Sequence, residues 1–230
     1  MRIILLLLTL FLTCPVFAGA PPPAASKVLF LVGGPFHDNP ELYPIVQNLL
    51  QATGEFTVTV SRDLDQFKPE NIKNYDLVIM YSTRLTPTPQ QEKGLIDFVS
   101  NGKGFVGIHS ATDTFLDSDA YWKMVGGRFT THGNELFKVN MTGKSHPIVK
   151  GMSAFEIKDE SYCHNYNPDA KMIVLARRDK DSEPVAWVQY YGRGRVFVTS
   201  LGHDKVAWDN AGFQKLVLNG SRWATFRLNP

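Results

Sequence analysis

Short apolar runs alternate with one-sided helical patterns along the first half of the chain. Residues 27–32 read KVLFLV, a nearly continuous apolar run that is typical of a strand covered on both faces. Gly33-Gly34-Pro35 ends this run in a loop. Apolar positions then recur at i, i+3, i+4, i+7 and i+8, which predicts a helix with one buried face. The residues on that face are Leu42, Ile45, Val46, Leu49 and Leu50.

The same alternation continues to residue 108. Residues 56–60 and 76–80 predict two further strands, and residues 104–108 predict a fourth. Between them, Thr88-Pro89-Gln90-Gln91 combines a threonine N-cap, a proline at the first helical position and a capping-box glutamine. Strands that alternate with helices favour a mostly parallel sheet with helices on both faces.

The second half of the chain is richer in strands. They are predicted at residues 136–141, 155–158, 172–176, 185–190 and 195–200, and a final helix follows with its apolar face around Phe213 and Trp223. We find no internal repeat and no linker. The sequence therefore predicts one layered α/β domain.

The N-terminal segment has the order of a secretory signal peptide. Arg2 precedes an aliphatic stretch, and Ala18-Gly19-Ala20 resembles a cleavage site. We expect residues 1–20 to be a signal peptide, residues 21–26 a short Pro/Ala-rich leader, and residues 27–226 the folded domain. This organisation predicts a secreted or periplasmic protein with no membrane attachment after cleavage. Cys163 would then be the remaining cysteine, which leaves no intrachain disulfide.

Composition narrows the range of partners. The formal net charge of the 230-residue chain is +2, and no basic run is present, which argues against nucleic acid. The sequence lacks a Walker loop, a G-x-G-x-x-G after the first strand, G-x-S-x-G and H-E-x-x-H. We expect a small molecule as the partner.

Three histidines follow predicted strands at the point where each strand ends. His37, with Asp38 beside it, follows the first strand; His109 follows the fourth; and His203, with Asp204 beside it, follows the last. Ligands of open parallel sheets bind beyond the carboxyl ends of the strands. These three imidazoles are therefore predicted to meet at one site.

Other residues are candidates for the same site. His132 and the acidic pair Asp159-Glu160 follow predicted strands or turns. Tyr162 and Trp208 lie near the predicted site, where their rings would stack on a sugar ring. Histidine near neutral pH transfers protons, ligates a divalent metal, or donates a hydrogen bond to a hydroxyl, and Glu160 suits a general base or an oxygen ligand. We expect His146 and His164 to be surface or capping residues, and Asp113 and Asp117 to be N-caps.

Separated motifs in a fixed order resemble the ThuA-like (trehalose utilisation) family. They are residues 104–111 (GFVGIHSA), 113–115 (DTF), 125–129 (VGGRF), 159–160 (DE) with Tyr162, 184–187 (PVAW), 191–197 (YGRGRVF), 201–204 (LGHD), and 219–220 (NG) before Trp223. The resemblance extends over residues 27–226. It implies a flavodoxin-like layered fold similar to that of class I glutamine amidotransferases.

In those amidotransferases a cysteine occupies the sharp turn after a strand and a histidine follows a later strand. Here the resemblance places His109 at the cysteine position and His203 near the position of the catalytic histidine. Without a thiol at the turn, a route through a cysteine nucleophile is closed. Amidotransferase activity is therefore not expected.

The family association predicts a protein of carbohydrate catabolism that acts on a disaccharide, a glycoside or a 3-keto-sugar. The leading hypothesis is a sugar-modifying lyase, isomerase or hydrolase in which His109 and His203 share acid–base chemistry and Glu160 serves as base or ligand. His37, Asp38, His132, Tyr162, Asp204 and Trp208 would bind the substrate. Alternatively, several of the histidines bind a divalent metal ion, which leaves fewer of them to act as acid or base. A non-catalytic carbohydrate-binding protein that relies on Trp208 and Tyr162 is the second hypothesis.

Overall fold

The computed structural model describes residues 24–228. The predicted signal peptide (residues 1–20) and residues 21–23 of the predicted leader lie outside the described residues. Within residues 24–228, no helix has the length and apolar character needed to cross a membrane.

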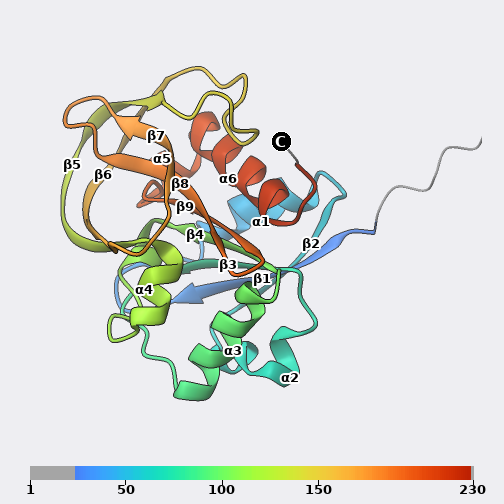
Figure 1. Ribbon diagram of the computed structural model, residues 1–230. Coiled ribbons are helices and arrows are strands. Elements are labelled where there is room, and N and C mark those ends of the chain that lie inside the picture. Colours follow the sequence, from blue (N-terminus) through green and yellow to red (C-terminus); the bar gives the residue numbers. More distant parts are fainter. Residues whose placement is uncertain (1–23, 229–230) are drawn as a thin grey trace, which may run out of the picture.

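Nine strands and six α-helices make up the described chain (Figure 1). The strands are β1 (Ser26–Gly33), β2 (Phe56–Ser61), β3 (Leu77–Ser82), β4 (Gly104–Ile108), β5 (Gly127–Met141), β6 (Phe155–Tyr166), β7 (Ile173–Arg178), β8 (Pro184–Tyr191) and β9 (Gly194–Thr199). The α-helices are α1 (Tyr43–Gln51), α2 (Pro69–Ile72), α3 (Pro89–Ser100), α4 (Asp119–Val125), α5 (Lys205–Trp208) and α6 (Ala211–Ala224), and the 3-10 helices are η1 (Leu64–Phe67) and η2 (His109–Thr112).

All nine strands belong to one sheet with the order β2-β1-β3-β4-β9-β8-β7-β5-β6. Strands β2, β1, β3, β4 and β9 are parallel to one another. The remaining pairs, from β9–β8 to β5–β6, are antiparallel. The predicted α/β class is confirmed, but the sheet is mixed rather than mostly parallel. Only two residues separate β8 from β9, and a connection that short permits only an antiparallel hairpin.

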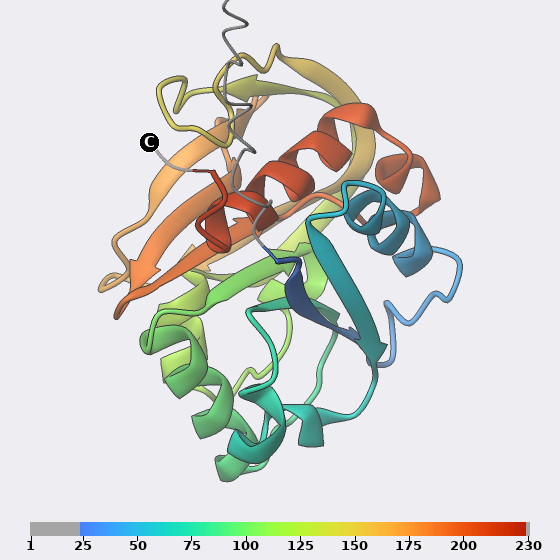
Figure 2. The same cartoon turned by 90° about the vertical axis from the view of Figure 1, so that its right-hand side faces the viewer.

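Helices cover both faces of the sheet, as predicted. Residues of β1 alternate between the two cores: Phe30 packs with residues of α1 and α6, and Leu31 packs with residues of α2, α3 and α4. Figure 2 shows α1 and α6 on one side of the parallel strands and α2 and α3 on the other. Burial on both faces explains the unbroken apolar run of β1.

Helix α3 begins as its sequence predicts. Thr88 accepts a hydrogen bond from the Gln91 backbone N–H, and the Gln91 side chain accepts one from the Thr88 N–H, which completes the capping box.

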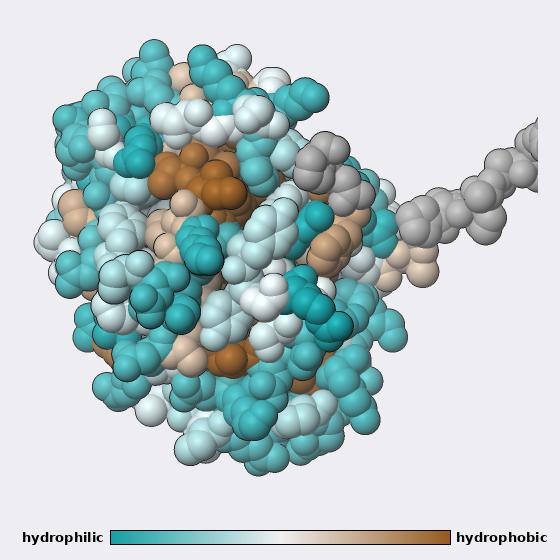
Figure 3. Space-filling view, in the orientation of Figure 1, coloured by the Kyte–Doolittle hydropathy of each residue, from teal (hydrophilic) through white to brown (hydrophobic). Residues whose placement is uncertain are grey.

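The surface in the view of Figure 3 is mostly polar, and apolar side chains are exposed in small patches.

The loops after β1 and β3 touch at the carboxyl edge of the sheet. Gly34 has a φ of +101°, and a Cβ atom at this position would lie 1.9 Å from the Thr83 carbonyl oxygen. Thr83 in turn donates its backbone N–H to the Gly33 carbonyl at 3.0 Å. Only glycine permits both this backbone conformation and this close approach.

We expect Gly34→Ala to lower the free energy of unfolding by at least about 2 kcal/mol, because the strained backbone and the clash with Thr83 add. Urea denaturation measures the change. Gly54→Ala is the matched control, since Gly54 also has a positive φ but faces open space. Equal destabilisation by the two substitutions would contradict the role given to the close contact.

Candidate functional site

His109 occupies a strained turn directly after β4. Its φ is +47°, a region that non-glycine residues rarely adopt and that is often found at functional sites. The imidazole is fully buried, and Nδ1 lies 2.7 Å from the Ser200 carbonyl oxygen. A carbonyl only accepts, so Nδ1 carries a proton and the lone pair of the neutral ring is on Nε2. Nε2 is buried and makes no hydrogen bond with the described residues.

His37 and His203 reach the same point from two other loops. His37 Nε2 lies 3.2 Å from His203 Nδ1, and His37 Nδ1 lies 2.6 Å from the Thr83 hydroxyl. The rings of His37 and His109 are 4.9 Å apart between centroids. The three histidines after strand ends therefore meet at one site, as the topology of the parallel strands requires.

Glu160 enters the cluster from β6, in the antiparallel half of the sheet. Its Oε2 lies 3.1 Å from His203 Nδ1 and 3.3 Å from His109 Nε2, and its Oε1 lies 3.3 Å from His132 Nδ1. The neighbouring Asp159 fixes this arrangement. Its buried carboxylate accepts hydrogen bonds from the backbone N–H groups of Glu160, Gly202 and His203 at 2.7–3.0 Å.

Four side chains thus present one ligand atom each within a very small volume. The donor atoms of His37, His109, Glu160 and His203 all lie within 4.8 Å of one another. Tetrahedral ligands at about 2.0–2.1 Å from a zinc ion would lie about 3.3 Å apart. Three of the six separations are 3.1, 3.2 and 3.3 Å, close to that value, and none exceeds 4.8 Å. The group therefore fits a divalent metal ion of this size.

Burial and neighbouring charges favour a neutral His37 imidazole beside an ionised Glu160 carboxylate. Burial, with the neighbouring His109 and His203, lowers the pKa of His37 to about 3. Burial acts to raise the pKa of Glu160, but the contact and charge of His109, with His203 and His132, outweigh it and lower that pKa. Burial raises the pKa of Asp159 despite its backbone hydrogen bonds. Neutral imidazole and carboxylate are the forms that ligate metal.

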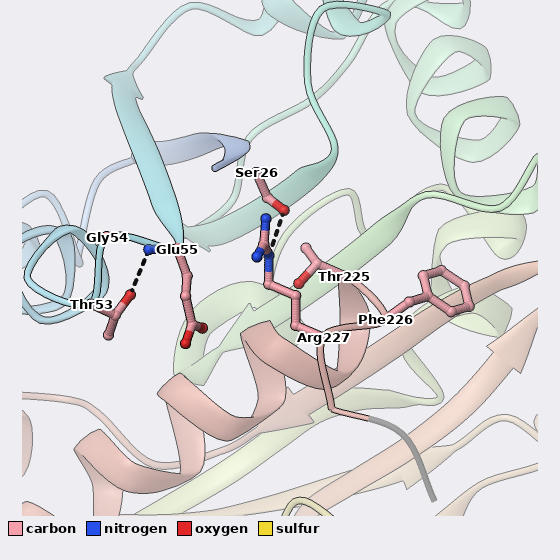
Figure 4. Close-up of a pocket in the computed structure, with 7 residues that line it drawn as sticks. All are labelled: Ser26, Thr53, Gly54, Glu55, Thr225, Phe226 and Arg227. Atoms are coloured by element: carbon pink, nitrogen blue, oxygen red, sulfur yellow. Dashed lines mark hydrogen bonds between the residues drawn. The ribbon is translucent and has the colours of Figure 1, made fainter. Parts of the chain in front are cut away.

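A cavity of about 380 Å³ opens onto the cluster. Its lining residues are Phe36, His37, Arg84, Asp113, Phe129, His132, Glu160, Tyr162 and His203. A larger hollow of about 820 Å³ lies at the opposite edge of the sheet, around Ser26 and Arg227 (Figure 4). That hollow is lined by no histidine or cysteine, and its Glu55 is already paired with Arg222. The smaller cavity is therefore the better candidate for a site of acid–base or metal chemistry.

The predicted site residues divide into two groups. His37, His132, Glu160, Tyr162 and His203 line the cavity, and His109 lies behind it with its ring 4.0 Å from that of Tyr162. Asp38, Asp204 and Trp208 are not among the lining residues.

Each of those three side chains has a structural partner instead. Asp38 pairs with Arg62 at 2.8 Å, and Asp204 caps α5 by accepting from the Ala207 N–H. Trp208 is fully buried and donates from its indole nitrogen to the Gly202 carbonyl at 2.7 Å. Stacking of Trp208 on a sugar ring is therefore not supported.

Sequence reasoning missed Arg84, Asp113, Phe36 and Phe129 as lining residues. Asp113 is not an N-cap: Ser118 caps α4, whereas Asp113 ends η2 as its C-cap and pairs with Arg84 at 2.9 Å. Arg84 and Asp113 each follow shortly after a parallel strand, and this position is the sequence signal that could have placed them at the carboxyl edge of the sheet. Their pairing depends on two loops that are 29 residues apart.

His164 is a buried residue rather than a surface one. Its Nδ1 lies 3.2 Å from Glu183 Oε1 and its Nε2 lies 3.2 Å from the Thr112 hydroxyl. Thr112 donates to the His109 carbonyl at 3.1 Å. The series of contacts from Glu183 through His164 and Thr112 therefore supports the strained turn at His109. His146 packs against Trp223, remote from the cavity lining.

Fold and site together define an α/β protein with a histidine-lined cavity at the carboxyl edge of its parallel strands. Comparison with known families identifies the class: the chain belongs to the trehalose utilisation (ThuA) family, whose model matches residues 27–224. The resemblance predicted from the sequence is confirmed.

Solved structures with the same fold include two ThuA-like proteins. The one from Parabacteroides merdae has a TM-score of 0.79 at 22% identity, over 89% of this chain and 91% of that one. The one from Bacteroides uniformis has a TM-score of 0.71 at 20% identity, over 90% and 94%. A β-galactosidase from Rahnella sp. R3 matches with a TM-score of 0.63 at 16% identity, over 89% of this chain but 32% of that one. No curated protein sequence matches this chain.

The buried His164 makes stability depend on pH. Burial lowers its pKa, and the opposing Glu183 does not compensate, so the unfolded chain binds a proton more readily than the native one. The free energy of unfolding should therefore fall as the pH drops below about 6.5, by up to about 1.4 kcal/mol per pH unit for this group. We expect His164→Gln to show a shallower decline between about pH 7 and pH 5 in urea denaturation. Parallel curves for the variant and the native protein would contradict this assignment.

Proposed function

We propose that this protein binds a divalent transition-metal ion through His37, His109, Glu160 and His203 and acts on a carbohydrate in the adjoining cavity. The observation that carries the proposal is the convergence of four ligand atoms within 4.8 Å. Three imidazoles and one carboxylate suit zinc, iron, nickel or copper. Magnesium and calcium prefer oxygen ligands throughout.

The surroundings of the donors support this assignment. Metal-ligating histidines commonly donate their second ring nitrogen to an oxygen, which fixes the tautomer and the orientation of the ring. His109 does so to Ser200, and His37 Nδ1 lies 2.6 Å from the Thr83 hydroxyl, which can accept such a bond. A metal ion would also satisfy the buried Nε2 of His109.

Four protein ligands fill a tetrahedral shell, so a metal ion at this position would polarise a carbonyl or hydroxyl oxygen of the bound sugar by expanding to five-coordination. His132 is the histidine of the cavity that stands outside the four-residue group, and its side chain is 45% exposed. We assign proton transfer to His132, with Glu160 orienting its ring from 3.3 Å. This division leaves His109 and His203 to binding rather than to acid–base chemistry.

The family association supports a role in carbohydrate catabolism, on a disaccharide, a glycoside or a 3-keto-sugar. A 3-keto group acidifies the neighbouring C–H bond, so removal of that proton leads to elimination or isomerisation. Export by the predicted signal peptide would place the reaction in the periplasm or outside the cell. Amidotransferase chemistry is disfavoured because His109 stands at the turn where a cysteine nucleophile would be needed.

We also infer that the parallel half is flavodoxin-like in its layering. Its strand order, β2-β1-β3-β4-β9, corresponds to the 2-1-3-4-5 order of that fold when β9 is counted as the fifth parallel strand. The non-catalytic sugar-binding alternative is less well supported, because Trp208, on which it relied, is fully buried.

The metal-free protein should bind one Zn²⁺ or Co²⁺ ion per chain and should not respond to Mg²⁺. We expect His109→Ala to weaken Zn²⁺ affinity by more than about 100-fold, since the loss of a direct ligand exceeds the usual effect of an outer-shell change. Competition with a chromophoric chelator measures the affinity. His146→Ala is the control, because His146 lies outside the group. Unchanged Zn²⁺ affinity in His109→Ala would rule out the proposed centre.

Removal of the metal with a chelator should abolish turnover, and added Zn²⁺ or Co²⁺ should restore it. The assay incubates the mature chain with trehalose, sucrose and their 3-keto derivatives and follows the sugars by NMR. If the chelated protein retains full turnover, the metal has no part in the reaction.

His132→Gln should separate catalysis from metal binding. We expect turnover to fall by about 10²–10⁴-fold, the usual contribution of a positioned acid or base, while Zn²⁺ affinity falls by no more than the roughly 10–100-fold effect of an outer-shell change. The same NMR assay and chelator competition provide both values. A variant that turns over normally would show that His132 does not transfer the proton.

A further inference from the structure

Arg84 lines the cavity beside the histidine cluster but has no part in the function proposed so far. It lies in the loop after β3 with a φ of +52°. Glycine or asparagine adopts such a φ with less strain than arginine. A strained residue at the wall of a cavity is typical of functional sites, so the Arg84 side chain is a candidate for binding a ligand.

Two loops hold this arginine in place. Its Nε donates to both carboxylate oxygens of Asp113 at 2.9 Å, and its backbone N–H donates to the Asp113 carbonyl at 2.8 Å. The Leu85 N–H donates to the Thr114 hydroxyl, and the Phe115 N–H donates to the Leu85 carbonyl, both at 3.1 Å. The guanidinium is therefore oriented before any ligand arrives, which reduces the entropy lost on binding.

The outer end of the guanidinium is available to a ligand. Neither Nη group of Arg84 makes a hydrogen bond within residues 24–228, since only Nε is used by Asp113. The Arg84 side chain is 47% exposed, whereas that of Asp113 is 8% exposed. The negative charge of the pair is thus more deeply buried than the positive one, and Arg84 contributes a planar guanidinium to the cavity lining.

The fork of N–H donors on a guanidinium matches the geometry of a carboxylate, which it binds through two parallel hydrogen bonds. Phe129 and the largely exposed Phe36 supply apolar walls of the same cavity, and these suit the C–H faces of a sugar ring. Within the described lining residues, the carboxylates of Asp113 and Glu160 are each already paired, with Arg84 and with the histidines.

We propose that Arg84 determines specificity by binding a carboxylate group on the sugar substrate, so that the preferred substrates are acidic glycosides or sugar acids. The inference rests on the proposed carbohydrate function. It adds that an acidic substituent distinguishes the preferred sugar from its neutral counterpart.

Matched pairs of sugars test this directly. The probes are methyl glucuronoside against methyl glucoside, and lactobionate against lactitol, each pair differing by a carboxylate in place of a hydroxymethyl group. Their binding to the Zn²⁺-loaded protein is measured by ligand-observed NMR or calorimetry. Arg84→Gln removes the charge, Arg84→Lys retains it without the fork, and Arg193→Gln is a control at an exposed arginine outside the cavity.

We expect the native protein to bind the acid of at least one pair about 10-fold more tightly than its neutral partner, as a charged hydrogen-bonded contact requires. Arg84→Gln should reduce this ratio to about one, Arg84→Lys should retain part of it, and Arg193→Gln should leave it unchanged. If Arg84 only tied the two loops together, its loss would weaken both members of a pair equally and leave the ratio intact.

A ratio near one in the native protein, a ratio that survives Arg84→Gln, or no binding of any of the four sugars would overturn the proposal. Zn²⁺ affinity measured on the same samples distinguishes this failure from that of the metal centre. Native Zn²⁺ binding without acid preference refutes the role of Arg84 alone, whereas acid preference without Zn²⁺ binding refutes the metal centre and leaves Arg84 in place.

Discussion

The buried carboxylate of Asp159 is the contact on which the site depends. It accepts three backbone N–H groups, from Glu160 on β6 and from Gly202 and His203 after β9. These residues belong to the antiparallel and parallel halves of one sheet. Burial of a carboxylate is costly, as the raised pKa of Asp159 indicates, and hydrogen bonds to a charged group contribute about 1.5–3 kcal/mol each in return. The same contact brings Glu160 to the histidines.

Backbone strain concentrates at the same edge of the sheet. His109, Arg84 and Phe115 all have φ values near +50°, and all three lie in the segments that follow β3 or β4. Such residues persist only where the surroundings over-determine them. The Ser200 carbonyl holds the His109 ring in place, and hydrogen bonds between the loops after β3 and β4 hold Arg84. Strain and long-range hydrogen bonds together hold imidazole and guanidinium groups around one cavity with little freedom to rearrange.

A histidine at the turn after β4 changes what this fold can do. A thiol there would offer a nucleophile, whereas His109, with its proton fixed on Nδ1, offers a buried lone pair directed at two more histidines and a carboxylate. The family model and the two ThuA-like structures establish the fold and do not specify a reaction, since one fold supports many chemistries. The donor set and the cavity support the proposed metal-assisted sugar chemistry, in which His132 is the proposed proton carrier outside that set.

The sequence by itself determined the five parallel strands, helices α1 and α3 with the capping box of α3, and the meeting of His37, His109 and His203. These follow from local periodicity and from the rule that parallel strands share a carboxyl edge. Only the tertiary structure decided the mixed sheet, the entry of Glu160 from β6, the Arg84–Asp113 pair and the burial of Trp208. Strand order and contacts between distant loops depend on packing and on hydrogen bonds over long sequence separations, which no local pattern encodes.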